Sequence, residues 1–338
     1  MINDKRNSLK AIPLYLLSQF STSEAAGYDL TLLKTEQAHE HSVKYPYLTI
    51  NNSTTDILNH PAFNGFSSLI LPWDDPERNH NIPIRNMQRL LPYHSHLEPE
   101  TIVQSLNRMI DDKSRGKTIF YDIYSDKQKS ENAEMKNTGL FFFRGKKDAP
   151  FAVVCPGGGF EYVGSVHEGF PYAVEINRQG FNVFVLRYRV GRGGLPAMQD
   201  LAQAISYIFN HAKLLEVSTK GYSVWGSSAG ARMAAAVGSY GVASFGGDNL
   251  PKPSAVVMAY TGYSDYTEHE PATFVAVGSR DGIAPPSVMK HRVNALRQNG
   301  TLVEYHQYEG MGHGFGVGKE TAADGWVTLA TDFWRKNS

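Results

Sequence analysis

The alternation of apolar runs with helical patterns between residues 117 and 338 constrains the fold of this chain more than any other feature. Runs such as FAVVCPG, FNVFVLRYRV and TFVAVGS lack the polar alternation of half-exposed strands, so they are typical of strands covered on both faces. The predicted strands are 118–124, 139–145, 151–157, 181–190, 222–226, 254–260, 273–279 and 302–308. The predicted helices among and after them are 168–180, 196–215, 228–241, 287–300 and 328–337. Strands that alternate with helices predict an α/β protein with a doubly wound, mostly parallel sheet.

The first 115 residues follow a less regular pattern, with many prolines and scattered aromatic side chains. This pattern predicts ordered loops. One helix is expected at 98–116, where Pro99 suits the first turn and Gly116 a stop. We therefore divide the chain into an irregular N-terminal extension, 1–115, and a main domain, 116–338.

The extension is a candidate lid or pocket cover. Its aromatic side chains could cover a pocket, or they could pack the extension against the main domain, and the sequence leaves both readings open. These side chains include Phe63, Phe66, Trp73 and Tyr93.

Composition excludes several partners and cofactors. The chain carries 33 basic and 33 acidic side chains, which argues against a nucleic-acid or anionic-membrane partner. Its one cysteine, Cys155, excludes an internal disulfide, and no Cys/His zinc spacing is present. We expect no cofactor and a small-molecule partner; the oligomeric state is not predicted.

The N-terminus resembles a secretory leader only weakly. Lys5, Arg6 and Lys10 precede a short apolar piece, but Pro13 interrupts it and Asp4 is acidic. No apolar run reaches the roughly 18 residues of a membrane helix. We expect a cytoplasmic protein, with secretion as the open alternative.

Two adjacent serines lie in YSVWGSSAG, where a predicted strand meets a predicted helix. A Gly-x-Ser-x-Gly pattern at such a junction presents the serine on a sharp turn, and the residues two before and two after it must be small. Gly226 and Gly230 flank Ser228 in this way, whereas Trp225 occupies the position two before Ser227. Ser228 is therefore the candidate nucleophile, and the amide of the next residue could stabilise developing negative charge.

A nucleophilic serine needs a base, which follows it in the chain order Ser, acid, His. His313 lies in the glycine-rich loop EGMGHGFGVG after the last predicted strand, which makes it the best candidate. His306 falls in a strand pattern, His291 in a helix pattern, and His269 just before a strand.

The orienting acid has two candidates. Asp281 in VAVGSRDGIAPP follows the carboxyl end of a predicted strand, where doubly wound sheets present functional side chains. Asp265 follows the preceding strand and could instead cap a turn, so we favour Asp281 and keep Asp265 as the alternative.

The glycine run in FAVVCPGGGFEYVG could supply a further oxyanion donor, because consecutive glycines let the backbone approach a substrate. A phosphate loop is the competing interpretation, but the run lacks both the Gly-Lys-Ser/Thr ending and the Gly-x-Gly-x-x-Gly spacing.

Together these motifs resemble the α/β-hydrolase superfamily, and in particular its esterase/lipase-like branch with the acetyl-xylan-esterase-like carbohydrate esterases. The resemblance spans about residues 117 to 336 and rests on CPGGGF, HEGFPYA, FVLRYRVG, AMQDLAQAI, WGSSAG, SRDGIAPP and GHGFG. It implies an α/β-hydrolase fold with residues 116–338 as the catalytic domain. It implies a triad of Ser228, Asp281 and His313, with an oxyanion hole from the amides of Gly158, Gly159 and Ala229.

Further residues near these motifs are candidate pocket residues. They are Gly157, Phe160, His167, Glu168 and Ser227. Glu168 could instead be an acid that favours a helix N-terminus.

A histidine pair and the single cysteine are weaker candidates for a functional site. His94 and His96 form a His-x-His pair without a third ligand nearby, so no metal is expected. Cys155 is expected to be a buried small residue at a strand end.

The function that we expect is a serine hydrolase that cleaves small acyl esters, acetyl esters above all, through an acyl-enzyme. An amide or peptide hydrolase with the same triad is the alternative. A non-catalytic binding protein on the hydrolase fold is a third hypothesis, which predicts a damaged triad.

Overall fold

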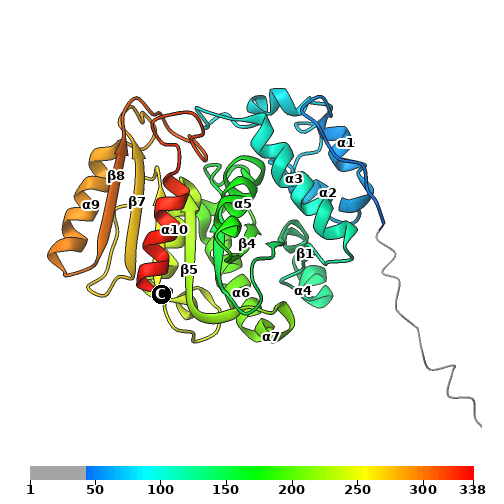
Figure 1. Cartoon of the computed structure of the whole chain (residues 1–338). Coiled ribbons are helices and arrows are strands. Elements are labelled where there is room, and N and C mark those ends of the chain that lie inside the picture. The colour runs from blue at the N-terminus through cyan, green and yellow to red at the C-terminus, as the bar shows by residue number, and fades with distance from the viewer. Residues whose placement is uncertain (1–42) are drawn as a thin grey trace, which may run out of the picture. The chain divides into compact units, whose positions relative to one another are not determined.

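The computed structural model describes residues 43–338, which form one compact unit. The leader-like stretch and the first 42 residues of the expected extension lie outside the described residues. Figure 1 shows the strands in the middle of the molecule, with α5 and α10 in front of them.

Eight strands form a single sheet in the order β1-β2-β4-β3-β5-β6-β7-β8. They are β1 (Phe120–Tyr121), β2 (Gly139–Phe143), β3 (Pro150–Cys155), β4 (Asn182–Arg187), β5 (Ser218–Ser227), β6 (Ala255–Ala259), β7 (Ala272–Gly278) and β8 (Val303–Tyr308). β1 pairs antiparallel with β2 and β2 with β4, and all other pairs are parallel. The predicted doubly wound, mostly parallel sheet is therefore confirmed.

The main helices are α1 (Thr54–Leu58), α2 (Ser67–Ile70), α3 (Pro99–Ser114), α4 (Asp126–Glu131), α5 (Phe170–Arg178), α6 (Leu195–Asn210), α7 (Ala212–Leu215), α8 (Ala229–Tyr240), α9 (Pro286–Gln298) and α10 (Trp326–Asn337). A π-helical turn, Ser165–Gly169, leads into α5. The helix predicted at 196–215 is divided at His211, which separates α6 from α7. The first strand is also shorter than predicted.

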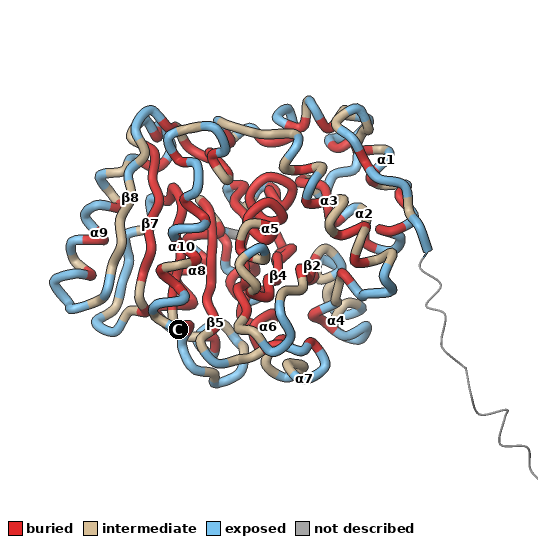
Figure 2. The backbone as a smooth tube through the Cα atoms, in the orientation of Figure 1, coloured by how far each residue is buried: buried red, intermediate tan, exposed pale blue. Residues whose placement is uncertain are grey.

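Two apolar layers cover the two faces of the sheet, because successive strand residues point to opposite faces. Val154, on one face, shares a core with α1, α2, α3, α5 and α10. Val153, on the other, shares a core with α6, α8 and α9. Figure 2 shows the inner strands buried, the edge strand β8 only partly so, and the exposed residues in the surrounding loops and outer helix faces.

The described part of the extension, 43–115, contributes to the first of these cores. Ile57, Phe63, Ile102 and Leu106 are buried in it, together with Phe141 of the sheet. This part therefore packs on the main domain, while its role as a pocket cover stays a prediction.

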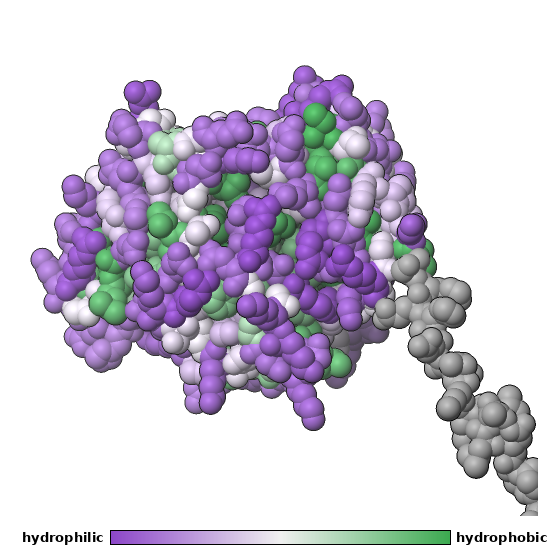
Figure 3. All heavy atoms as spheres, viewed as in Figure 1, coloured by the Kyte–Doolittle hydropathy of each residue, from purple (hydrophilic) through white to green (hydrophobic). Residues whose placement is uncertain are grey.

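The surface in the view of Figure 3 is mostly hydrophilic, with hydrophobic side chains in separate patches. Among the helices of residues 43–338, none combines the length and the hydropathy that a membrane crossing requires.

Candidate active site

Ser228 joins the end of β5 to the start of α8, in a strained backbone conformation with φ 50° and ψ −117°. The turn is as crowded as the sequence predicted. A Cβ on Gly230 would lie 1.9 Å from the carbonyl oxygen of Cys155, and a Cβ on Gly226 would lie 2.2 Å from the Gly230 carbonyl. Both positions therefore require glycine.

The two adjacent serines differ in what their hydroxyls reach. The Ser227 side chain is buried and its hydroxyl donates to the Tyr172 hydroxyl at 3.2 Å. The Ser228 residue is partly exposed, and its Oγ lies 2.8 Å from Nε2 of His313. Of the two, only Ser228 contacts a base.

His313 is oriented by Asp281 from the loop after β7. Its Nδ1 lies 2.8 Å from Oδ2 of Asp281, while Oδ1 of Asp281 accepts the amides of Ile283 at 2.9 Å and Ala284 at 2.8 Å. His313 and Asp281 are nearly inaccessible to solvent. With the Nδ1 proton held by the carboxylate, Nε2 is free to accept the proton of the Ser228 hydroxyl.

The alternative acid has another environment. Asp265 is exposed and accepts hydrogen bonds from the hydroxyls of Tyr240 at 2.7 Å and Tyr263 at 3.3 Å. The structure thus brings Asp281, and not Asp265, to His313.

Backbone amides beside Ser228 are available to a developing oxyanion. Gly159 and Ala229 line the pocket at Ser228, and Gly158 does not. Among the hydrogen bonds of residues 43–338, none uses the amide of these three residues as donor. The Ser228 amide itself donates to the Ala259 carbonyl at 2.9 Å.

The pocket at Ser228 is open, with a volume of about 320 Å³. Its lining residues are Gly159, Phe160, Ser228, Ala229, Arg232, Thr261, Gly262, Tyr263, Ile283, Ala284 and His313. Phe160 is the one predicted pocket residue with a side chain in this lining. The lining does not include the other four predicted pocket residues, which are buried: Gly157, His167, Glu168 and Ser227.

Glu168 is the centre of a buried polar network. One carboxylate oxygen accepts the Gly157 amide at 2.5 Å, and the other lies 2.8 Å from both the Tyr260 hydroxyl and Nε2 of His94. Burial favours the neutral acid, but His94, His167 and the Tyr260 hydroxyl together outweigh it, and the pKa of the Glu168 carboxyl lies below its usual value. Glu168 is therefore a structural anion, not a pocket group.

His167, beside Glu168, is held neutral. Burial, reinforced by the neighbouring His94, lowers the pKa of His167 to about 3. Its Nε2 donates to the Gly314 carbonyl at 3.1 Å, in the loop that carries His313.

A metal ion has one group of candidate ligands among the described residues. Ligand atoms of His94, His167 and Glu168 lie within 4.8 Å of one another, so one distant segment supplies the two partners that the sequence did not show for His94. His96 lies elsewhere and pairs with Glu98. Because the ring of His94 already contacts Glu168 and Tyr162, an ion would have to replace existing hydrogen bonds.

Cys155, at the end of β3, is buried as expected. Burial raises the pKa of its thiol, so the thiolate that could act as a nucleophile is disfavoured.

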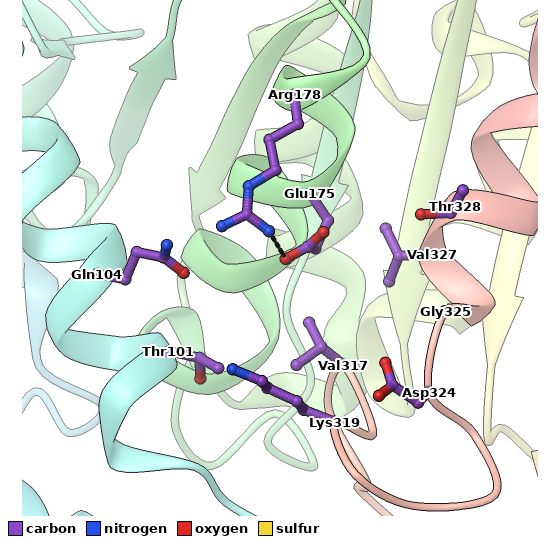
Figure 4. Close-up of a pocket in the computed structure, with 10 residues that line it drawn as sticks. All are labelled: Thr101, Gln104, Glu175, Arg178, Val317, Lys319, Asp324, Gly325, Val327 and Thr328. Carbon is purple, nitrogen blue, oxygen red and sulfur yellow. Dashed lines mark hydrogen bonds and ion pairs between the residues drawn. The ribbon is translucent and has the colours of Figure 1, made fainter.

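A second pocket, of about 240 Å³, lies among α3, α5, α10 and the loop before α10 (Figure 4). An ion pair between Glu175 and Arg178 forms one side of it. Thr101, Gln104, Lys319 and Asp324 are among its other polar lining residues, and none of them belongs to the arrangement around Ser228.

The sheet order, the strained serine turn and the hydrogen-bonded Ser228, His313 and Asp281 define the chain as a protein with the α/β-hydrolase fold. Residues 143–255 match the BD-FAE family model. The acetylxylan esterase of Xylanibacter ruminicola is 29% identical over 87 residues, which are 25% of this chain and 18% of that protein. The chain thus resembles esterase-like α/β-hydrolases, although the match spans under a fifth of that relative's length.

Solved structures support the same fold. The acetyl ester-xyloside bifunctional hydrolase of Caldicellulosiruptor lactoaceticus has a TM-score of 0.55 and 21% identity, over 64% of this chain and 95% of that one. The α/β-hydrolase MGS-M1 from a deep-sea metagenome has a TM-score of 0.51 and 23% identity, over 59% and 92%. At these identities the likeness establishes the fold alone.

Several residues of the site were not found from the sequence. Ile283 and Ala284 hold Asp281 through their amides, and the Asp-Gly pair before them is a turn signal that could have shown it. Tyr260 follows the carboxyl end of β6, the usual place for functional side chains. The contact of His94 with Glu168 has no local signal, because 74 residues separate them.

Proposed function

We propose that this protein is a carboxylic-ester hydrolase in which Ser228 is the nucleophile. The observation that carries the proposal is the continuous contact from Ser228 Oγ to His313 Nε2 and from His313 Nδ1 to Asp281, at 2.8 Å each. A serine in this setting loses its proton to the imidazole as it attacks, while the carboxylate keeps the imidazole in the required tautomer.

The reaction follows from these positions. Ser228 Oγ attacks the ester carbonyl carbon, His313 accepts the hydroxyl proton, and the amides of Gly159 and Ala229 stabilise the oxyanion. His313 then returns the proton to the leaving alcohol, which departs and leaves the acyl group on Ser228. Water, deprotonated by His313, releases the acid by the same steps in reverse order.

Small acyl groups on a carbohydrate are the proposed substrates, with acetyl the first to test. The name of the Xylanibacter ruminicola relative supports this class. The pocket also supports it, since it is open and combines Thr261 and Arg232 with the rings of Phe160 and Tyr263. Such a lining offers hydrogen bonds and ring faces to a sugar that carries the ester.

The test compares hydrolysis of p-nitrophenyl acetate, butyrate and octanoate, acetylated xylo-oligosaccharides and p-nitroacetanilide. We expect ester hydrolysis that is fastest for acetate, release of acetate from the saccharide, and little anilide cleavage. Ser228→Ala should abolish turnover, while the matched Ser227→Ala variant should keep most of it. Anilide cleavage faster than ester cleavage would favour an amidase, and absence of all turnover would favour a binding protein.

A further inference from the structure

Residues 93–95 of the extension, here called the 93–95 segment, contact the loop that carries His313. The Ser95 amide donates to the His313 carbonyl at 2.9 Å and approaches the Gly314 carbonyl at 3.3 Å. A Cβ on Gly314 would lie 2.6 Å from the Tyr93 carbonyl oxygen, so the two backbones touch. The backbone of the proposed base is thus held by a segment outside the α/β domain.

The same segment reaches the glycine loop through a side chain. His94 contacts Oε1 of Glu168 at 2.8 Å, and Oε2 of that carboxylate accepts the Gly157 amide at 2.5 Å. The side chains of His94 and Glu168 are 2% and 0% exposed, so water cannot substitute for either partner. Tyr162, itself in the glycine loop, holds the other ring nitrogen of His94 at 3.0 Å.

Gly157 lies between Glu168 and the proposed nucleophile. A Cβ built on Gly157 would be 2.6 Å from Oε2 of Glu168 and 3.0 Å from Cβ of Ser228. A shift of the carboxylate would therefore move the backbone that leads directly to Gly158 and Gly159. The Gly159 amide, one of the two that we propose to receive the oxyanion, follows two residues after the anchored one.

We propose that the 93–95 segment is a positioning element of the active site, in which His94 anchors the glycine loop through Glu168 and Ser95 anchors the His313 loop. This inference rests on the proposed function, because it assigns the two loops to one reaction. It makes the extension part of the catalytic architecture. His94 touches no reacting atom and acts through Glu168, so it is a positioning residue.

The experiment uses the full chain with His94→Leu, the conservative His94→Gln, and, as the matched control, His96→Leu, which changes a histidine that lies just outside the segment and pairs with Glu98. In His94→Leu the glycine-loop amides lose their anchor, so kcat for p-nitrophenyl acetate should fall about 100-fold, the usual cost of a lost oxyanion donor, with KM changed less than threefold. The amide of His94→Gln can still donate to Glu168, so this variant should keep kcat within about tenfold. His96→Leu should behave as the wild type.

A second measurement does not depend on activity. Amide hydrogen exchange followed by mass spectrometry should show faster exchange in peptides covering 156–164 and 310–316 in His94→Leu, and unchanged exchange in His96→Leu. If His94→Leu does not fold, Tyr162→Phe removes one contact of the ring and should lower kcat about tenfold.

The outcomes separate the two proposals. A wild type without turnover, but with the exchange difference, would overturn the proposed function and keep the positioning role. A folded His94→Leu, or its substitute Tyr162→Phe, with kcat within threefold of an active wild type would overturn the positioning role. Equal losses in His94→Gln and His94→Leu, or a loss confined to KM, would also overturn it.

Discussion

Replacing Asp281 by asparagine tests the geometry of the site, because the hydrogen bonds around this side chain determine which end of the asparagine amide faces His313. Oδ1 of Asp281 accepts two backbone amides, at 2.9 and 2.8 Å, and Oδ2 faces Nδ1 of His313. In Asp281→Asn the one amide oxygen should stay with the two backbone donors, which turns the NH2 group toward His313. Nδ1 must then accept, the ring proton moves to Nε2, and the base that Ser228 needs is lost.

The size of the effect follows from the cost of the opposite orientation. Turning the asparagine over would lose these two hydrogen bonds, of about 1 kcal/mol each, which corresponds to a factor of roughly 30 in rate. Loss of the charge that stabilises the imidazolium adds to this, and the same substitution in serine proteases lowers kcat by about 10⁴. We expect kcat/KM to fall by about 10³ or more.

The assay is the initial rate of p-nitrophenyl acetate hydrolysis, with thermal unfolding to show that the variant is folded. Asp265→Asn is the matched control, because Asp265 is exposed and contacts tyrosine hydroxyls instead of His313. A folded Asp281→Asn within tenfold of the wild type would refute the reasoning, as would an equal loss in Asp265→Asn.

Three further predictions concern the turn at Ser228, the buried residue His167 and the possibility of a bound metal ion. Gly230→Ala places a Cβ 1.9 Å from a carbonyl oxygen and should cost about 1–3 kcal/mol of stability, measured by urea unfolding, whereas Gly282→Ala, with nothing within 4 Å, should not. Because the pKa of His167 is lowered to about 3, the unfolded chain binds a proton below about pH 6.5 that the folded chain does not. The free energy of unfolding should therefore fall by roughly 2 kcal/mol between pH 6.5 and 4.5. Urea titrations should show a smaller fall over this range in His167→Gln, and an equal fall in the variant and the wild type would contradict this. Treatment with EDTA should leave turnover unchanged, and a loss reversed by zinc would reassign His94, His167 and Glu168 to a metal site.

The fold and the position of Ser228 in its turn could be predicted because their signals are local. Apolar runs identify strands, and the crowding around Gly226 and Gly230 is a property of one turn, so it distinguishes Ser228 from Ser227. The choice between Asp281 and Asp265 could not be settled, because both follow neighbouring strands and only the loop geometry shows which carboxylate reaches His313.

The buried network could not be predicted for a different reason. Glu168 was a candidate pocket residue because it follows the glycine loop, but the π-helical turn Ser165–Gly169 is buried throughout. The partner that accounts for its burial, His94, comes from the extension, and the His-x-His pair there gave no sign of a contact with Glu168. Long-range contacts of this kind leave no periodic trace in a single sequence.

The measurement that tests the central claim most directly is peptide mass spectrometry after reaction with diethyl p-nitrophenyl phosphate, which modifies activated serines. We predict one phosphoryl group per chain, on Ser228, formed in step with the loss of esterase activity. It should be absent from Ser228→Ala and from a wild-type sample unfolded before treatment, and retained in Ser227→Ala. An esterase-active protein that is labelled on Ser227 or elsewhere, or that remains active and unlabelled, would contradict the assignment of Ser228 as the nucleophile.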